Sequence, residues 1–171
     1  YCKKREDCRI TRVRLLPEHP RALPEALAAI READVLLLGP GSLYTSIIPN
    51  LLVDGVVEAI QASQALKIYV CNVMTQEGET EGYTVSDHIQ ALFEHGAPHL
   101  FDVCLVNSSP IPRDVAARYA AEGAEPLRCD LDACAALGVE MESMTLAWQT
   151  HTANVRRIRR EDRGKGVVRE R

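Results

Sequence analysis

The residues of this chain that could do chemistry gather in a short glycine-rich stretch. Residues 36–50 read LLLGPGSLYTSIIPN, so an apolar run gives way to Gly-Pro-Gly-Ser and then to two further hydroxyl residues. Gly39 and Gly41 would let backbone N–H groups approach a ligand closely. The hydroxyl donors of the stretch are Ser42, Thr45 and Ser46. With the oriented amides of a following helix, these groups could hold a phosphate or pyrophosphate without a cationic side chain.

An ordinary Gly-Pro turn followed by a capping Ser42 would explain the same loop, and the loop alone favours neither interpretation. Its spacing differs from the Gly-x-Gly-x-x-Gly pattern of dinucleotide-binding folds. It also lacks the lysine of the Gly-x-x-x-x-Gly-Lys-Ser/Thr pattern, which cradles nucleoside triphosphates. Rossmann-type dinucleotide binding and Walker-type hydrolysis are therefore both unsupported.

A second polar stretch, NVMTQEGET, follows the next apolar run and starts at Asn72. The side chains of Asn72, Thr75 and Gln76 could contact a ring edge or a sugar hydroxyl of a ligand. Glu77 and Glu79 are potential carboxylates for acid–base or Mg²⁺ chemistry. A surface loop with solvated acids is the more ordinary interpretation, and it suits Glu77 better than Glu79.

The histidines and cysteines form no set that catalysis or metal binding would use. Asp87 and His88 are adjacent, but neighbours on a helix point about 100° apart. Asp87 suits the first turn of a helix, and His88 is a weak candidate for ligand contact. No Ser-His-Asp or Cys-His set can be assembled by spacing, and the six cysteines lack the Cys-x-x-Cys spacing of zinc sites. We predict neither catalytic residues nor a metal site.

Apolar runs of strand length alternate with segments of helical period along most of the chain. The strand candidates are residues 10–16, 34–39, 67–73 and 101–107, with a weaker one at 139–148. The helix candidates are residues 23–33, 50–65, 86–96 with Ser86 as N-cap, and 111–123. This alternation predicts an α/β fold with right-handed crossovers and a Rossmann-like, doubly wound, mostly parallel sheet. Ligands of such sheets bind beyond the carboxyl ends of the strands, where both polar stretches and the 107–112 loop would meet.

Composition narrows the class of protein. The 171 residues make one domain or a large part of one, and 46% apolar residues suffice for a core. A net charge of −4 gives no reason to expect nucleic acid, and no apolar run has the length of a membrane span. Cys71 and Cys104 stand inside apolar, strand-like runs, where free thiols are common. We therefore expect a reduced, cytoplasmic protein.

Both ends of the chain carry charge. It opens with YCKKREDCRI, without a starting Met, which suggests the interior of a longer protein. The other end, residues 150–171, is basic and has five arginines between positions 156 and 163. We expect a solvated tail there, with an anion contact as the less favoured alternative.

Three motifs resemble one family closely: GPGSLYTSIIPNLLV, YVCNVMTQEGET and SDHIQAL. Together with the 107–112 loop and the RYAAEG segment around Tyr119, they are similar to the CofD/YvcK-like family over about residues 10–125. The continuation LYTSIIPNLLV favours the gluconeogenesis-factor (YvcK) branch of that family over its 2-phospho-L-lactate transferases.

The resemblance implies a cytoplasmic protein that binds nucleotide sugars, notably UDP-N-acetylglucosamine, and is linked to carbon metabolism, cell shape and cell-wall synthesis. It carries phosphate or nucleotide contact onto Gly39, Gly41, Ser42, Thr45 and Ser46, and weaker ligand contact onto Asn72, Thr75 and Tyr119. Cell-wall-synthesis proteins are the partners that it suggests, and it allows for homo-oligomers. It brings no assigned reaction and no certain cofactor.

The family's N-terminal half, with its Gly-Gly-Gly-Thr-Gly loop, has no counterpart among these residues. We therefore expect this chain to supply the second half of the fold, and its residues beyond 150 match the family's ending poorly. The alternative function is a CofD-type transferase that moves a phosphate-linked group from a nucleotide donor to an acceptor alcohol. Such a reaction would need Mg²⁺ held by carboxylates. No carboxylate pair lies in the glycine-rich or 107–112 loops, so we favour a non-catalytic protein.

Overall fold

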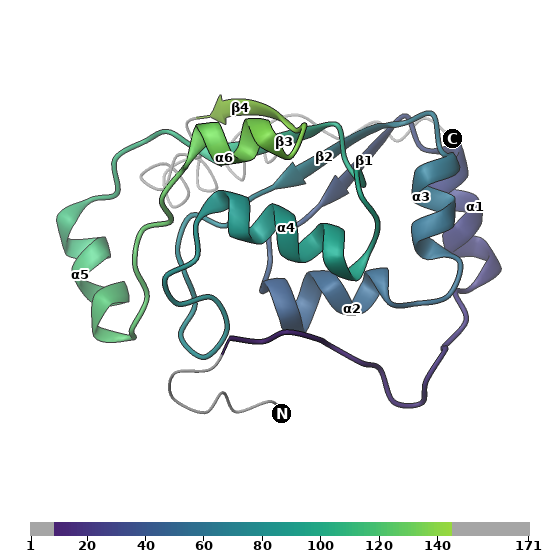
Figure 1. Ribbon diagram of the computed structural model, residues 1–171, viewed down its shortest axis with the longest axis horizontal. Helices are drawn as coiled ribbons and strands as arrows, with labels where there is room; N and C mark the ends of the chain where they lie inside the picture. Colours follow the sequence, from purple (N-terminus) through teal and green to yellow (C-terminus); the bar gives the residue numbers. More distant parts are fainter. Residues whose placement is uncertain (1–8, 145–171) are drawn as a thin grey trace, which may run out of the picture.

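The computed structural model describes residues 9–144, in which helices pack against a parallel sheet (Figure 1). The strands are β1 (Val35–Leu38), β2 (Leu66–Val70), β3 (Val103–Asn107) and β4 (Glu140–Met144). They pair in the order β1-β2-β3-β4, and each pairing is parallel. The predicted α/β class and the parallel sheet are confirmed.

Helical segments precede β1 and connect each strand to the next. They are α1 (Pro24–Glu32), the π-helical turn η1 (Leu43–Ile47), α2 (Ile48–Leu51), α3 (Val56–Ala62), α4 (Val85–His95), α5 (Arg113–Ala121) and α6 (Leu131–Ala136). Four of the five predicted strands and three of the four predicted helices lie close to their expected positions. Among residues 9–144, no helix has both the length and the apolar character that crossing a membrane requires.

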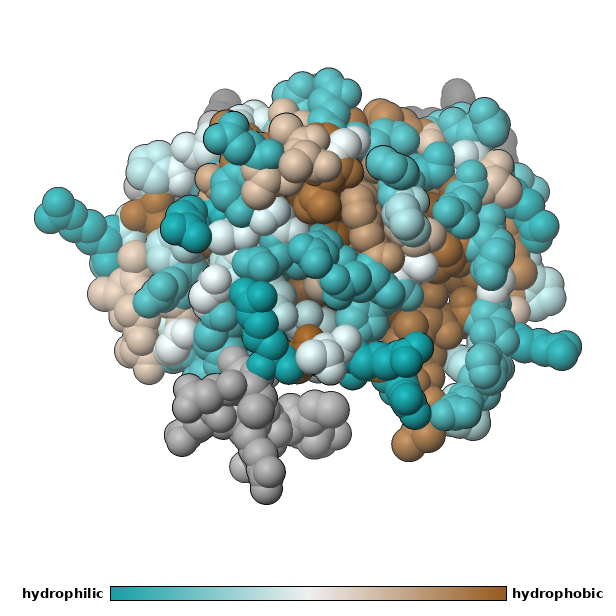
Figure 2. Space-filling model, in the orientation of Figure 1, coloured by the Kyte–Doolittle hydropathy of each residue, from teal (hydrophilic) through white to brown (hydrophobic). Residues whose placement is uncertain are grey.

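One face of the sheet supports the core. The register pairs Leu38 with Tyr69 and Tyr69 with Cys104, and all three side chains are buried. Helices α2, α4 and α6 lie on one side of the sheet in Figure 1. Leu43 and Ile48 contribute fully buried side chains from η1 and α2. Seen from the same direction, the surface is mostly hydrophilic, and hydrophobic residues gather toward α1 and α3 (Figure 2).

The other face of the sheet is exposed in the described part of the chain. Val35, Leu37 and Leu66 point to that side, because side chains alternate along a strand. Their exposed fractions are 49%, 65% and 48%. Parallel sheets are normally covered on both faces. Residues 9–144 thus form the part of a doubly wound fold that carries one of its two helical layers.

The strand predicted at residues 10–16 is wrong. Residues 10–16 pair with none of the strands described within residues 9–144. Instead, the Ile10 carbonyl accepts a hydrogen bond from the Tyr44 hydroxyl at 3.3 Å, and the Val13 N–H donates to His95 Nε2 at 3.2 Å. Ile10 and Val13 also pack against the core. The apolar residues of this extended segment therefore pack against η1 and α4, whereas the prediction placed them in a sheet.

The single helix predicted at residues 50–65 is also wrong, because the chain leaves the helical path between α2 and α3. The Asp54 N–H donates to the Pro20 carbonyl at 2.9 Å, and the Ala22 N–H donates to the Asp54 carbonyl at 3.2 Å. These bonds pair the segment with residues that precede α1. Gly55 follows with φ 92°, a conformation that favours glycine, and α3 begins after it.

Thr84 caps helix α4, in place of the predicted Ser86. Thr84 and Asp87 form a capping box, in which each side chain accepts a hydrogen bond from the other residue's backbone N–H. The N–H and the hydroxyl of Ser86 both donate to Asp130, immediately before α6. Helix α6 was not predicted from the sequence; it has six residues and is attached to the start of α4 by this contact.

Gly39 offers a test of the turn after β1. Its φ is 80°, and a Cβ atom there would lie 2.8 Å from the Val70 carbonyl oxygen. Gly78 has nearly the same φ, 79°, but a Cβ atom would meet nothing within 4 Å. We expect Gly39→Ala to lower the free energy of unfolding in urea by at least about 1 kcal/mol more than Gly78→Ala. Equal losses would show that the β2 carbonyl does not constrain this turn.

Candidate binding site at the carboxyl edge of the sheet

The glycine-rich loop and the second polar stretch meet beyond the ends of β1 and β2, as predicted. The Gly41 N–H donates to the side-chain Oδ1 of Asn72 at 3.3 Å. Gly39 passes so close to the Val70 carbonyl that no side chain fits between them. Two neighbouring parallel strands thus bring both loops to one edge, where α/β proteins commonly bind ligands.

Apolar residues fix the turn that follows the glycines. Leu43, Tyr44 and Ile47 of η1 are buried, whereas Thr45 and Ser46 are exposed. The turn therefore places its apolar side chains in the core and its hydroxyls on the outside. This burial pattern leaves Thr45 and Ser46, two of the hydroxyl residues predicted to contact a ligand, on the surface.

Side chains of the second stretch accept the hydrogen bonds that this turn offers. Thr45 Oγ1 donates to Glu79 Oε1 at 2.9 Å, and the Tyr44 N–H donates to Glu79 Oε2 at 3.3 Å. The Ser42 hydroxyl donates to the side-chain oxygen of Gln76, whose Nε2 lies 3.5 Å from Glu79 Oε1. Glu79 is only 9% exposed. The sequence offered Glu79 as a potential carboxylate for acid–base or Mg²⁺ chemistry or as a solvated acid, and neither interpretation anticipates that it completes the glycine-rich loop.

Thr75 joins the second stretch to the segment after α5. It is 7% exposed, and its N–H donates to the Glu125 carbonyl at 2.7 Å. The Glu125 N–H donates back to Thr75 Oγ1 at 2.8 Å. One bond joins two backbone groups and the other uses the Thr75 hydroxyl, so Thr75 helps to hold the loop that carries Glu79. This role could not be found from its spacing, because Glu125 lies 50 residues further along.

Tyr119 lies on α5 and is half-buried. Its carbonyl accepts hydrogen bonds from the N–H groups of Glu122 and Ala124, which end the helix. It is absent from the wall of the pocket that the next loops form. The structure thus groups Gly39 to Ser46 with Asn72, and it sets Tyr119 on a separate helix.

A pocket of about 260 Å³ opens beyond the ends of β2 and β3. Asn72, Asn107, Ser109 and Cys129 give it polar atoms, and Val73, Val106, Ile111 and Leu127 are among its apolar residues. Such a mixture of apolar walls and a few polar groups is typical of small-molecule sites. The 107–112 loop, predicted to belong to this edge, does line it.

Two asparagines differ in how they meet this pocket. Asn107 closes its own loop: its Nδ2 donates to the Ser109 carbonyl at 2.8 Å, and its Oδ1 accepts from the Ser109 N–H at 3.2 Å. Asn72 lines the pocket and also accepts the hydrogen bond from Gly41. Asn72 is therefore the side chain that connects the glycine-rich loop to the pocket.

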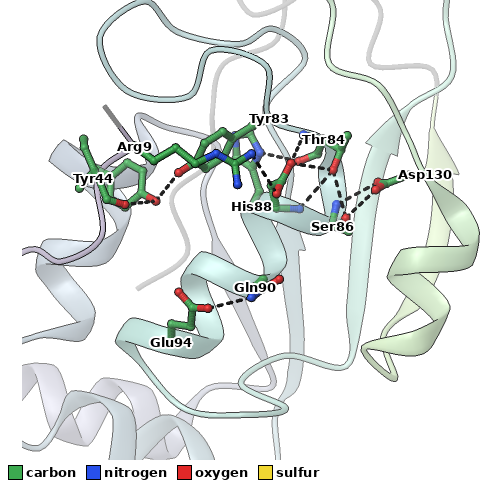
Figure 3. Close-up of polar contacts among 11 residues, drawn as sticks. Arg9, Tyr44, Tyr83, Thr84, Ser86, His88, Gln90, Glu94 and Asp130 are labelled. Atoms are coloured by element: carbon green, nitrogen blue, oxygen red, sulfur yellow. Dashed lines mark hydrogen bonds and ion pairs between the residues drawn. The ribbon is translucent and has the colours of Figure 1, made fainter. Parts of the chain in front are cut away.

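Tyr44, Tyr83 and His88 form a cluster of ring contacts, and Arg9 lies beside it (Figure 3). The hydroxyls of Tyr44 and Tyr83 are 2.8 Å apart, and the Arg9 guanidinium lies 4.8 Å from the Tyr83 ring centroid. Burial, together with the Tyr83 hydroxyl, raises the pKa of Tyr44 above its ordinary value. Tyr44 is therefore neutral at physiological pH, and its position in the core indicates support of the turn.

His88 lies in the core, edge-on to Tyr83 with ring centroids 5.6 Å apart. Its Nδ1 is 2.9 Å from the Thr84 carbonyl oxygen. Because a carbonyl can only accept, Nδ1 carries the proton and donates this hydrogen bond. Its Nε2 is buried without a hydrogen-bond partner among the described residues. The hypothesis that His88 touches ligand finds no support, since the ring is 0% exposed. Asp87 points into the capping box, so the two residues form no dyad.

The described cysteines are free. Cys71, Cys104 and Cys134 are buried, and Cys129 is exposed at the pocket. A hydrogen bond with Cys71 and burial raise the pKa of the Cys104 thiol far above its usual range, so it behaves as a small apolar group. Within residues 9–144, no three His, Cys, Asp or Glu side chains come together as metal ligands would.

Comparison with known proteins connects this geometry to a family. The family model described as 2-phospho-L-lactate transferase CofD matches residues 2–147. This chain belongs to the CofD family. Within it, the gluconeogenesis factors of Halalkalibacterium halodurans and Bacillus subtilis are 54% and 48% identical over 131 and 133 residues. The resemblance inferred from the three motifs is thereby confirmed.

A solved structure supports the same conclusion. A crystal structure of a Bacillus halodurans protein, 53% identical, matches with a TM-score of 0.77 and covers 79% of this chain but 43% of that one. The matches to the two gluconeogenesis factors take in 77% and 78% of this chain, and 41% and 42% of theirs. The chain therefore spans about two fifths of the length of these curated relatives.

Burial of His88 predicts a pH dependence of stability. Burial lowers the pKa of His88 below its ordinary value of 6.5, although the bond to Thr84 opposes this. The unfolded chain therefore takes up a proton first as the pH falls, and stability is lost below about pH 6.5 by up to about 1.4 kcal/mol per pH unit. In urea denaturation from pH 7.5 to 5, His88→Phe should lose less stability than wild type. Parallel profiles would contradict this account.

Proposed function

We propose that this chain is the ligand-binding part of a regulatory protein that holds a nucleotide sugar of the UDP-N-acetylglucosamine type. One observation carries the proposal: the Gly41 N–H bonds to Asn72, which joins the glycine-rich loop to the pocket. A phosphate group would lie on the loop, and the rest of the ligand would extend past Asn72. Relatives named gluconeogenesis factor support a role in the regulation of carbon metabolism.

Each part of the site has a proposed contact. The pyrophosphate would meet the backbone at Gly39 and Gly41 and the hydroxyls of Ser42, Thr45 and Ser46. The amide groups and apolar walls of the pocket suit a pyrimidine ring or an acetamido group. Thr75 would contribute by holding the second loop in place, and Tyr119 would be a contact from α5.

Binding without reaction is the favoured mode. Glu79, the buried carboxylate beside the loop, already accepts two hydrogen bonds from it and is therefore not a free base. A sensor needs only two states of the protein with different affinities for the ligand. We propose cell-wall-synthesis proteins as the partners that read these states in the cytoplasm, with effects on cell shape, and homo-oligomers as the assembled form.

A CofD-type transferase is the second candidate, and the description of the matching family model favours it. In that reaction a phosphate-linked group would move from a nucleotide donor to an acceptor alcohol, with Mg²⁺ to neutralise developing charge. Of the two potential carboxylates of the second loop, Glu77 is exposed and Glu79 contacts the glycine-rich loop, so Glu79 is the one that would serve Mg²⁺ there. Turnover of a phosphorylated donor distinguishes this candidate from the first.

The first test is calorimetric titration of the intact gene product with UDP-N-acetylglucosamine, and with UDP, GDP and GTP for comparison, each with and without Mg²⁺. We expect saturable binding of the UDP-sugar and no product over hours, because the proposed site binds without a reacting base. Preference for a guanine nucleotide, or turnover with an acceptor alcohol, would contradict the sensor proposal and support the transferase.

The hydroxyls of the turn give a second test. We expect replacement of Ser42 and Thr45 together by Ala to weaken binding of UDP-N-acetylglucosamine by about 1–3 kcal/mol, the scale of hydrogen bonds to a charged group. Ser143→Ala, which removes an exposed hydroxyl from β4, serves as the control and should bind like wild type. Unchanged affinity in a double variant with a normal melting temperature would exclude these hydroxyls from the site.

A further inference from the structure

An internal anion already uses the hydrogen-bond donors of the proposed phosphate site. Thr45 and the Tyr44 N–H each donate to a different oxygen of the Glu79 carboxylate. Ser42 donates to Gln76, which also contacts Glu79. Both oxygens of one carboxylate thus accept hydrogen bonds from the loop that would bind a ligand phosphate.

A tight turn holds Glu79 in this position. The N–H groups of Glu79 and Thr80 both donate to the Gln76 carbonyl, at 3.2 and 2.9 Å. The Gln76 N–H donates to the Thr80 hydroxyl at 2.9 Å, and Thr80 is 1% exposed. In the same turn Glu77 is exposed, whereas Glu79 is buried. The fold therefore places this one carboxylate on the loop.

A carboxylate and a phosphate compete for the same donors. Both present anionic oxygens to N–H and O–H groups and form stronger hydrogen bonds than neutral acceptors do. The single hydrogen of the Thr45 hydroxyl serves one acceptor at a time. Two anions on neighbouring donors also repel each other, as paired carboxylates do. Glu79 and a ligand phosphate are therefore alternative occupants of Thr45.

We propose that Glu79 is the built-in anion of this site and that a ligand phosphate displaces it on binding. The inference rests on the proposed function, because it concerns the same loop. Displacement of Glu79 would release the turn at residues 76–80 from η1. The turn would still be joined, through Thr75, to Glu125 beyond α5. The surface of the turn then differs between free and bound protein, which provides the two states that a sensor needs.

The test compares wild type with Glu79→Gln and Glu77→Gln in the intact gene product. Each is titrated with inorganic pyrophosphate and, separately, with UDP-N-acetylglucosamine. Glu79→Gln removes the competing charge but keeps an acceptor oxygen for Thr45. We expect it to bind pyrophosphate about fivefold more tightly, the difference between hydrogen bonds to charged and to neutral acceptors. Glu77→Gln removes an exposed charge from the same turn and should bind like wild type.

The outcomes separate this inference from the proposed function. Unchanged or weaker pyrophosphate binding by Glu79→Gln, or an equal gain in Glu77→Gln, would overturn displacement. A selective gain for pyrophosphate in Glu79→Gln supports displacement, even if UDP-N-acetylglucosamine binds none of the proteins. In that case only the nucleotide-sugar proposal fails.

Hydrogen exchange of the wild-type protein gives a second test, which does not depend on a folded variant. Pyrophosphate should speed exchange of the Glu79 and Thr80 amides, because a displaced turn loses its contact with Thr45. Slower exchange at both amides would overturn the proposal, since the ligand would then be adding to the turn without displacing it.

Discussion

The close approach of Gly39 to the Val70 carbonyl is the constraint on which the carboxyl edge of the sheet depends. It lets the chain leave β1 directly against the end of β2, with a φ that only glycine adopts easily. This path brings Gly41 to Asn72 and starts η1 over the sheet. The wholly buried Leu43 then anchors the turn, so the hydroxyls beside it face outward. A single residue without a side chain thus sets the geometry of two loops.

The polar groups of this edge are largely paired within the protein. Buried polar groups must find partners to avoid a desolvation cost, and here each loop supplies the partners of the other. Thr75 holds the second loop from the α5 side, and Glu79 holds it from the η1 side. At such a site, a ligand binds by replacing hydrogen bonds within the protein with hydrogen bonds to the ligand. Its affinity for a ligand therefore reflects the difference in free energy between the contacts with the ligand and the contacts between the two loops.

The exposed face of the sheet relates this chain to its longer relatives. Leu37, at 65% exposure, lies on a face that parallel sheets normally cover, and the chain spans about two fifths of the length of the gluconeogenesis factors it matches. The hydrogen bonds described at the carboxyl edge, by contrast, join residues within 9–144 of this chain.

The sequence by itself determined the α/β class, the order of most elements, the family and the two polar loops. These follow from hydrophobic period and motif spacing, which are local properties of a chain. The errors at residues 10–16 and 50–65 arose where contacts with distant segments outweighed the local pattern. The cap of α4 was misplaced by two residues, because Ser86 has its partner at Asp130.

Only the tertiary structure decided which side chains face one another at the site. Thr45 meets Glu79 across 34 residues, and Thr75 meets Glu125 across 50. It likewise decided that His88 is sealed in the core, although the sequence left it a candidate for ligand contact. The physical reason is the same in each case: a hydrogen bond or a buried position is fixed by what packs nearby in space, and residue spacing does not encode it.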